Sequence, residues 1–297
     1  MPAKRFKFTE RDSELLVDLY KHRFLTARQV QRLHFPSKQT AYRRMRLLQA
    51  ARYVASFTVA NIDEAIFMVS PTGLQVVAEA LGVDREQLKW SETKAKPRDY
   101  YFMRHFLSIN DFRITLKLAC ESADIRLLGF IPDYYGEKSE RGVITKYIRD
   151  VICDVSADRR EVSHTPDGVF ALERDGKQAL FFLEIDRGTE VISDPSKGLS
   201  KALTFYAEYL LSGKYQRYAS DFSVGAFKGF RTLFVTSSSD RIEHIRSAAS
   251  ALPVSEKAKQ FCWLTTFDQV DSKGLLQPIW KSSLLSDHAS YSLLGKR

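Results

Sequence analysis

Three carboxylates stand at the ends of two neighbouring apolar runs, where together they could hold a metal ion. Asp167 opens the run 168–173, Glu184 and Asp186 close the run 178–186, and an Asp-Gly turn typical of a β-hairpin joins the runs. Because side chains alternate along a strand, Glu184 and Asp186 share one face, and the hairpin brings Asp167 close to them. Carboxylates on one face repel one another unless a cation lies among them. The pattern therefore predicts a site for a hard divalent cation, formed by Asp167, Glu184 and Asp186.

Four further side chains have both a chemical and a structural interpretation. His164 could move a proton or contact phosphate, and Tyr206 could be a nucleophile that forms a covalent DNA intermediate or a core residue. Arg187 could contact DNA or pair with an acidic neighbour. His105 lies on an apolar helix, where a core histidine is the commoner outcome. The local charge favours a cation site, since residues 151–200 hold 10 Asp and Glu against 6 Lys and Arg.

The elements that must position these residues alternate between helical and extended patterns. Helices are expected at 100–121, 196–212, 240–251 and 266–270, and strands at 125–131, 144–155, 168–173, 178–186, 232–236 and 261–265, with a loop at 132–142. This order predicts a mixed central sheet flanked by helices, an α+β or α/β domain with an αβββαβ core.

The Pro166-Asp167 pair and the Glu184-Ile185-Asp186 string resemble the motif of the PD-(D/E)xK nuclease superfamily. That resemblance implies a restriction-endonuclease-like domain in which the Asp and the Glu hold Mg²⁺ and the metal activates water. The family motif has a lysine where this chain has Asp186. The resemblance suggests Lys201, or Lys197 one turn earlier, as the cation that offsets charge on the phosphate.

A longer stretch is similar to the replication-relaxation family. The resemblance rests on PDGVFAL, FFLEIDRGTE, RTLFVT, DRIEHI and FCWLTT and spans about residues 9 to 280. It implies a winged helix joined to a nuclease-like domain, a link to plasmids and mobile elements, and relatives among mobilisation relaxases. On this basis the chain is expected to nick or relax DNA with Mg²⁺ or Mn²⁺. The alternative is a non-catalytic replication accessory factor or transcriptional regulator with an inactive nuclease-like domain.

The whole net charge of +9 lies at the start of the chain, since residues 1–60 hold 13 Lys and Arg against 4 Asp and Glu. Three short helices are expected, one capped by Thr9 or Asp12 and running to about residue 22, and two at 27–34 and 37–50. With two strands at 53–59 and 65–70 and a helix at 74–81, they predict a winged helix-turn-helix. Its third helix would bind double-stranded DNA through Lys38, Gln39, Arg43, Arg44 and Arg46. A protein-binding winged helix is the alternative. The polar segment 83–97 suggests a linker between a domain at 1–90 and one at 98–297.

Several other classes of protein are excluded by what the sequence lacks. It has no Walker A, GxGxxG or GxSxG motif, which argues against a nucleotide-driven motor, a Rossmann enzyme and a typical serine hydrolase. No apolar run approaches the length of a membrane helix, and the three cysteines form no zinc or disulfide pattern. We therefore expect a cytoplasmic protein without a membrane partner. Other replication or mobilisation proteins, or a second copy of the chain, could join it on DNA.

Overall fold

The computed structural model describes residues 6–88, 99–138, 144–153, 161–188, 198–253 and 255–294. It divides into two compact units, Met1–Ile114 and Thr115–Arg297, with the division inside helix α5 (Tyr100–Ser122). Most of the expected linker, and Lys197, lie outside the described residues. No helix in the part of the chain described here is long and apolar enough to cross a membrane.

The first half of α5 belongs to the first unit because its polar side chains bond to that unit's backbone. The amide of Asn110 donates to the carbonyls of His22 and Phe24, at 3.1 and 2.7 Å. The Gln29 amide donates to the carbonyl of Leu107 at 2.9 Å. The sequence had placed this whole helix in the second domain, and these contacts explain the difference.

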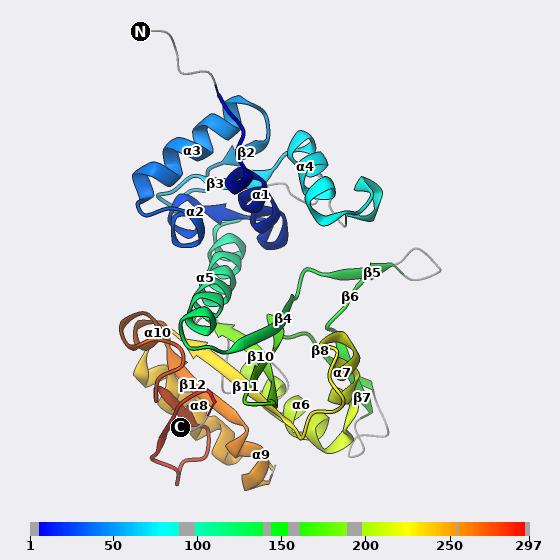
Figure 1. Cartoon of the computed structure of the whole chain (residues 1–297). Coiled ribbons are helices and arrows are strands. Elements are labelled where there is room, and N and C mark those ends of the chain that lie inside the picture. The colour runs from blue at the N-terminus through cyan, green and yellow to red at the C-terminus, as the bar shows by residue number, and fades with distance from the viewer. Residues whose placement is uncertain are drawn as a thin grey trace. The chain divides into compact units, whose positions relative to one another are not determined.

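The first unit has the element order of a winged helix-turn-helix (Figure 1). Its strands form one antiparallel sheet in the order β1-β3-β2. The helices and strands are α1 (Glu10–His22), β1 (Leu25–Thr26), α2 (Ala27–His34), α3 (Lys38–Ala50), β2 (Val54–Phe57), β3 (Ile66–Val69), α4 (Pro71–Leu81) and the 3-10 helix η1 (Arg85–Gln87).

Capping residues set the starts of the helices in this unit. The Thr26 hydroxyl accepts from the backbone N–H of Gln29 at 3.3 Å, and the Gln29 side chain accepts from the N–H of Thr26, which together form a capping box. The Ser37 hydroxyl caps α3 by accepting from the backbone N–H of Thr40 at 3.3 Å. Gly82 ends α4 with a φ of 64°. The three predicted helices are confirmed to within a few residues, and of the two caps considered for the first one, Thr9 precedes the helix.

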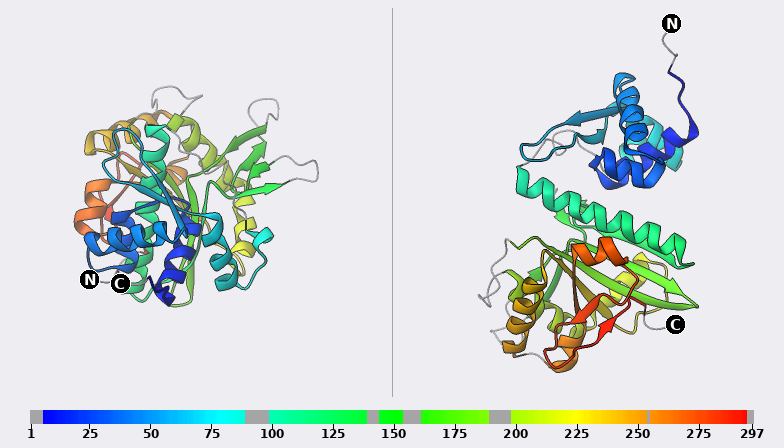
Figure 2. Two further views of the ribbon diagram at one scale, coloured as in Figure 1. Left: turned by 90° about the horizontal axis from the view of Figure 1, so that it is seen from above. Right: turned by 90° about the vertical axis from the view of Figure 1, so that its left-hand side faces the viewer.

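The second unit is built on a seven-stranded sheet in the order β14-β13-β12-β11-β10-β9-β4. Its main elements are β4 (Arg126–Pro132), β9 (Gly168–Arg174), β10 (Lys177–Asp186), α6 (Gly198–Ser212), β11 (Phe230–Thr236), α8 (Ser239–Ala251), α9 (Glu256–Gln260), β12 (Cys262–Thr266), α10 (Phe267–Lys273), β13 (Trp280–Ser282) and β14 (Ser290–Tyr291). Strand β9 is antiparallel to β4 and β10, whereas β10, β11 and β12 run parallel. Figure 2 shows the sheet with the gold helices α8 and α9 beside it.

Two small hairpins and two short helices interrupt this framework. They comprise β5 (Gly136–Lys138), β6 (Ile144–Lys146), β7 (Asp150–Cys153), β8 (Glu161–His164), η3 (Lys214–Arg217) and α7 (Tyr218–Asp221). The single run expected at 144–155 is therefore two strands, β6 and β7, that pair with β5 and β8. The element order α5, β4, β9, β10, α6, β11 follows the αβββαβ pattern once these insertions are set aside.

Candidate functional site

The Glu184 carboxylate lies near the end of the central strand β10 and is held by two aromatic side chains. Its Oε1 atom is 2.7 Å from Nε2 of His164 and also accepts a hydrogen bond from the hydroxyl of Tyr206 on α6. The side chain of Glu184 is only 15% exposed. Burial raises the pKa of the Glu184 carboxyl, and the nearby Asp167 carboxylate adds to that rise, against the opposing effect of His164 and Tyr206.

Asp167 is fixed beside Glu184 by the hairpin, as the sequence predicted. Its Oδ2 atom accepts the backbone N–H of Ile185 at 2.7 Å, and its own N–H donates to the carbonyl of Leu183. The next residue is Gly168, and its lack of a side chain matters because a Cβ there would lie 2.4 Å from the ring of Phe130. A larger residue at position 168 would therefore force the Phe130 ring on β4 to move.

Asp186 does not join the other two carboxylates, and this corrects the predicted three-carboxylate arrangement. Its Oδ2 accepts from Nε of Arg241 at 2.7 Å and its Oδ1 from the Nη2 of the same guanidinium at 3.1 Å. Thr236 and the backbone of Gly188 complete its hydrogen bonds. Asp186 is thus a buried partner of α8. Across the described ranges, no group of three or more His, Cys, Asp or Glu side chains could hold a metal ion.

A pocket of about 210 Å³ opens over this end of β10. Glu184, His164, Asp186 and Lys201 line it. Lys201 is exposed on the first turn of α6 and makes no hydrogen bond or ion pair within the described residues. A lysine therefore lies beside Glu184, but it comes from helix α6, whereas the lysine of the nuclease motif lies on the same strand as the glutamate.

The structure gives the other predicted site residues, Tyr206, Arg187 and His105, contacts or positions that do not require a role in chemistry. Burial and the neighbouring Glu184 raise the pKa of Tyr206 well above its ordinary value, so at neutral pH its hydroxyl is a hydrogen-bond donor. Arg187 lies over the ring of Phe267, with 5.6 Å between Cζ and the ring centroid. His105 belongs to the first unit, on α5, and is not among the residues that line the pocket.

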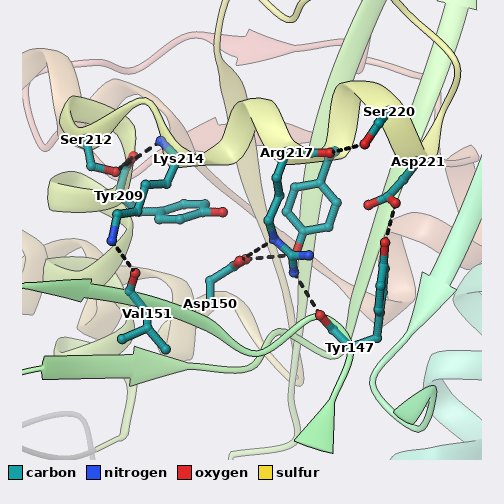
Figure 3. Close-up of polar contacts among 10 residues, drawn as sticks. Tyr147, Asp150, Val151, Tyr209, Ser212, Lys214, Arg217, Ser220 and Asp221 are labelled. Atoms are coloured by element: carbon teal, nitrogen blue, oxygen red, sulfur yellow. Dashed lines mark hydrogen bonds and ion pairs between the residues drawn. The ribbon is translucent and has the colours of Figure 1, made fainter. Parts of the chain in front are cut away.

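The strand pair that carries His164 is anchored by a buried polar network, drawn in Figure 3. Asp150 of β7 stands opposite His164 in the β7–β8 register. Its carboxylate accepts from Nε of Arg217 and from the hydroxyl of Tyr218, both at 2.7 Å, while Arg217 Nη2 also donates to the carbonyl of Tyr147 at 2.8 Å. Sequence reasoning missed this network because its two halves, one around Asp150 and one around Arg217, lie more than 60 residues apart. It fixes the hairpin from which His164 reaches Glu184.

The exposed face of α3 in the first unit carries most of the predicted DNA-binding residues. Lys38, Gln39, Arg43 and Arg46 are exposed, and Tyr42 between them is 46% exposed. Lys38 forms an ion pair of 2.7 Å with Glu64. Arg43 makes no hydrogen bond or ion pair within the described residues.

Arg44 departs from the prediction, because it points into the unit. Its Nε donates to Oδ1 of Asp12 at 2.6 Å, its Nη2 donates to the other carboxylate oxygen and to the carbonyl of Lys7, and its guanidinium lies over Phe6. Asp12 is fully buried and also accepts from Thr9. Arg44 is therefore a structural cation, and α3 offers DNA the side chains on either side of it.

Known proteins that resemble this chain fall into two groups. Residues 16–224 match the model of the replication-relaxation family. Among solved structures, a zinc-responsive MarR family member from Lactococcus lactis, ZitR, is 14% identical with a TM-score of 0.24, over 38% of this chain and 81% of that one. The C30AH42A mutant of ZitR is 15% identical with the same TM-score, over 36% and 78% of the two chains. No curated protein matches the sequence.

Proposed function

The chain belongs to the replication-relaxation family, and from that premise we propose that it binds duplex DNA through α3 and nicks one strand at the Glu184 pocket. The DNA-binding part rests on the winged helix-turn-helix order and on the exposed cations of α3. In such domains this helix enters the major groove. Lys38, Arg43 and Arg46 would contact phosphates and Gln39 a base edge.

The nicking part rests on one observation, the pocket that Glu184 and Lys201 line, with Asp167 beside it. The strand order β4-β9-β10-β11, with α5 before it and α6 within it, supports a PD-(D/E)xK-like unit. Lys201 would offset negative charge on the scissile phosphate from α6, in place of the strand lysine of that motif.

Two carboxylates fit a divalent cation here, and the third does not. Mg²⁺ is often bound through one or two carboxylates, with water and substrate phosphate oxygens as the other ligands. Asp167 and Glu184 suit that arrangement, since a cation would counter both the burial and the repulsion by Asp167 that raise the Glu184 pKa. Both oxygens of Asp186 are bonded to Arg241. Mg²⁺ or Mn²⁺ held by Asp167 and Glu184 would supply Lewis-acid activation of the phosphodiester.

His164 and Tyr206 hold the carboxylate in place for this role. Both bond to the same oxygen, Oε1 of Glu184, which leaves the second carboxylate oxygen as the better ligand for a cation. The hydrogen bonds from His164 and Tyr206 favour the charged form of Glu184. These two residues are therefore positioning residues in our proposal.

One observation favours a second function, a DNA-binding accessory factor or regulator without catalysis. The position two residues after Glu184 holds Asp186, which is used in a structural ion pair with Arg241. In that case the second unit would be a scaffold without catalytic activity, and DNA binding by the winged helix would be the function of the protein.

A plasmid assay separates the two functions. Supercoiled plasmid that includes the native origin is incubated with the protein and Mn²⁺, alongside Glu184→Gln, Asp167→Asn and Lys201→Ala. Asp271→Asn, an exposed carboxylate on α10, is the matched control. We expect nicked product from the wild type and the control, and none above background from Glu184→Gln and Asp167→Asn. Wild-type protein that binds the duplex but gives no more product than these variants would support the accessory function.

A further inference from the structure

A second, larger pocket lies at the opposite end of β10 from Glu184. Its volume is about 750 Å³, and it is lined by the β9–β10 turn, the start of β11 and the segment around β14. A cavity of this size can enclose a small organic ligand. Nothing in the proposed nicking reaction uses it.

Arg231 gives this pocket a cation that is held in place. The guanidinium Cζ lies 4.1 Å from the centroid of the Trp263 ring, and Trp263 in turn stacks on Tyr291 at 5.1 Å. Within the described residues, the Arg231 side chain makes no hydrogen bond and no ion pair. Burial lowers the pKa of Arg231, yet an arginine keeps its charge at neutral pH. A half-buried cation without a carboxylate partner attracts an anion.

Basic side chains outnumber acidic ones on the pocket lining around Arg231. Lys177 and Lys228 are exposed on the pocket lining and, like Arg231, have no carboxylate partner in the described part of the chain. The acidic Asp287 on the same lining already accepts hydrogen bonds from the Tyr291 hydroxyl and the Ala289 backbone, at 2.8 and 3.0 Å. The other acidic side chain, Asp175, is 83% exposed and lies 3.5 Å from Arg174. The lining therefore has an excess of positive charge centred on Arg231.

We propose that this pocket binds a nucleotide through its phosphate, with Arg231 as the central contact and Lys177 and Lys228 beside it. A planar guanidinium can bond two phosphate oxygens at once, and lysines add point charges around them. The rest of the cavity, with its aromatic and aliphatic walls, accommodates the sugar and the base. A free nucleotide and the phosphorylated end of a DNA strand present the same chemistry to this pocket.

Calorimetric titration of the full chain with dAMP, deoxyadenosine and inorganic phosphate tests the proposal. We expect dAMP to bind at least about tenfold more tightly than deoxyadenosine, and Arg231→Gln to weaken dAMP binding at least about tenfold. Lys273→Ala removes an exposed lysine on α10 and should leave the affinity unchanged. Equal affinities for dAMP and deoxyadenosine, or an unchanged affinity in Arg231→Gln, would overturn the proposal for a free nucleotide.

Single-stranded oligonucleotides with phosphate or hydroxyl ends form the second arm, measured in the Glu184→Gln background so that the strands are not cut. Tighter binding of a phosphorylated end, lost in Lys177→Ala/Lys228→Ala, identifies a strand end as the ligand. Both lysines are exposed, so this double variant tests the site even if Arg231→Gln fails to fold. If neither dAMP nor a phosphorylated end depends on these cations, the proposal is wrong. The calorimetric arm contains no strand to cut and the second arm uses the Glu184→Gln variant, so both results are independent of the nicking activity.

Discussion

Arg43 and Arg44 are adjacent in the sequence but should respond to alanine substitution in opposite ways. Arg44 forms an ion pair with Asp12, whose side chain is 1% exposed, whereas Arg43 is exposed on α3. Arg44→Ala should therefore destabilise the first unit without changing its salt-dependent DNA contacts. Arg43→Ala should weaken DNA binding without changing stability.

The stability loss in Arg44→Ala depends on which hydrogen bonds Asp12 keeps when Arg44 is removed. Removing one partner of a fully buried ion pair destabilises a protein by about 3–5 kcal/mol. Asp12 keeps its two hydrogen bonds from Thr9, and the Arg44 side chain is 20% exposed. We therefore expect a loss of about 2–3 kcal/mol, below the fully buried case. Since about 1.4 kcal/mol is a factor of ten, amides that exchange through unfolding of this unit should exchange about 30 to 150 times faster.

The loss should also depend on pH. Burial raises the pKa of the Asp12 carboxyl, but hydrogen bonds from Arg44 and Thr9 outweigh it and hold the pKa below its ordinary value. A group with a lowered folded pKa stabilises above its unfolded pKa, about 4 for Asp, and this stabilisation is lost as the pH falls through the folded pKa. The difference between wild type and Arg44→Ala should therefore shrink below about pH 4.

Hydrogen exchange of peptides from α1 and α3, measured by mass spectrometry, gives the stability of the first unit in the full chain. DNA affinity over a salt series gives the second quantity, and Arg43→Ala should reduce the slope of log affinity against log salt by about 0.9. Unchanged exchange in Arg44→Ala would refute the structural role assigned to that residue. An unchanged slope in Arg43→Ala would refute the use of α3 in the groove.

Three further predictions concern the second unit. Arg241→Ala leaves the buried Asp186 without its cation, so the second unit should lose about 3 kcal/mol and unfold about 6–12 °C lower by calorimetry; a shift under about 2 °C would contradict this. Arg217→Ala removes an anchor of the β7–β8 pair, and amides of β7 and β8 should exchange at least about tenfold faster while those of β9 and β10 do not change. Burial raises the pKa of Cys120 to about 11 and of Cys262 to about 12. Neither thiol should therefore be labelled by a disulfide reagent at pH 8 until guanidinium unfolds the chain. Labelling of the peptides that contain Cys120 or Cys262 in the native protein would disprove this prediction.

Local patterns predicted the elements well where the signal lies within a few residues. Thr26 and Gln29 are three apart and form the capping box that starts α2. The Asp-Gly turn at 175–176 joins β9 and β10 with the register that brings Asp167 beside Glu184. Strands β1, β5, β8, β13 and β14 were missed, and β5 lies where the sequence predicts a loop at 132–142. Segments of two to four residues are too short to show a periodicity.

Long-range charge pairs could not be predicted in the same way. The partner of Asp186 is Arg241, 55 residues later, and the partner of Arg44 is Asp12, 32 residues earlier. Strand alternation correctly placed Asp186 on the face of Glu184 but could not show that a helix from beyond β11 would neutralise it. Such pairings depend on tertiary packing, which a single sequence does not display.

These pairings change how the charge of the chain bears on its function. A cation that is bonded to a buried carboxylate, as Arg44 and Arg241 are, is already neutralised within the fold and attracts phosphate weakly. Arg43, Lys201 and Arg231 have no such partner in the described residues, so their charges are not neutralised within the fold and can attract an anionic ligand. These three lie on the exposed face of α3, beside Glu184, and in the larger pocket. The second unit has a net charge of only +1. Both of our proposals for this unit therefore rely on local cations, Lys201 and Arg231, which have no ion-pair partner in the described residues.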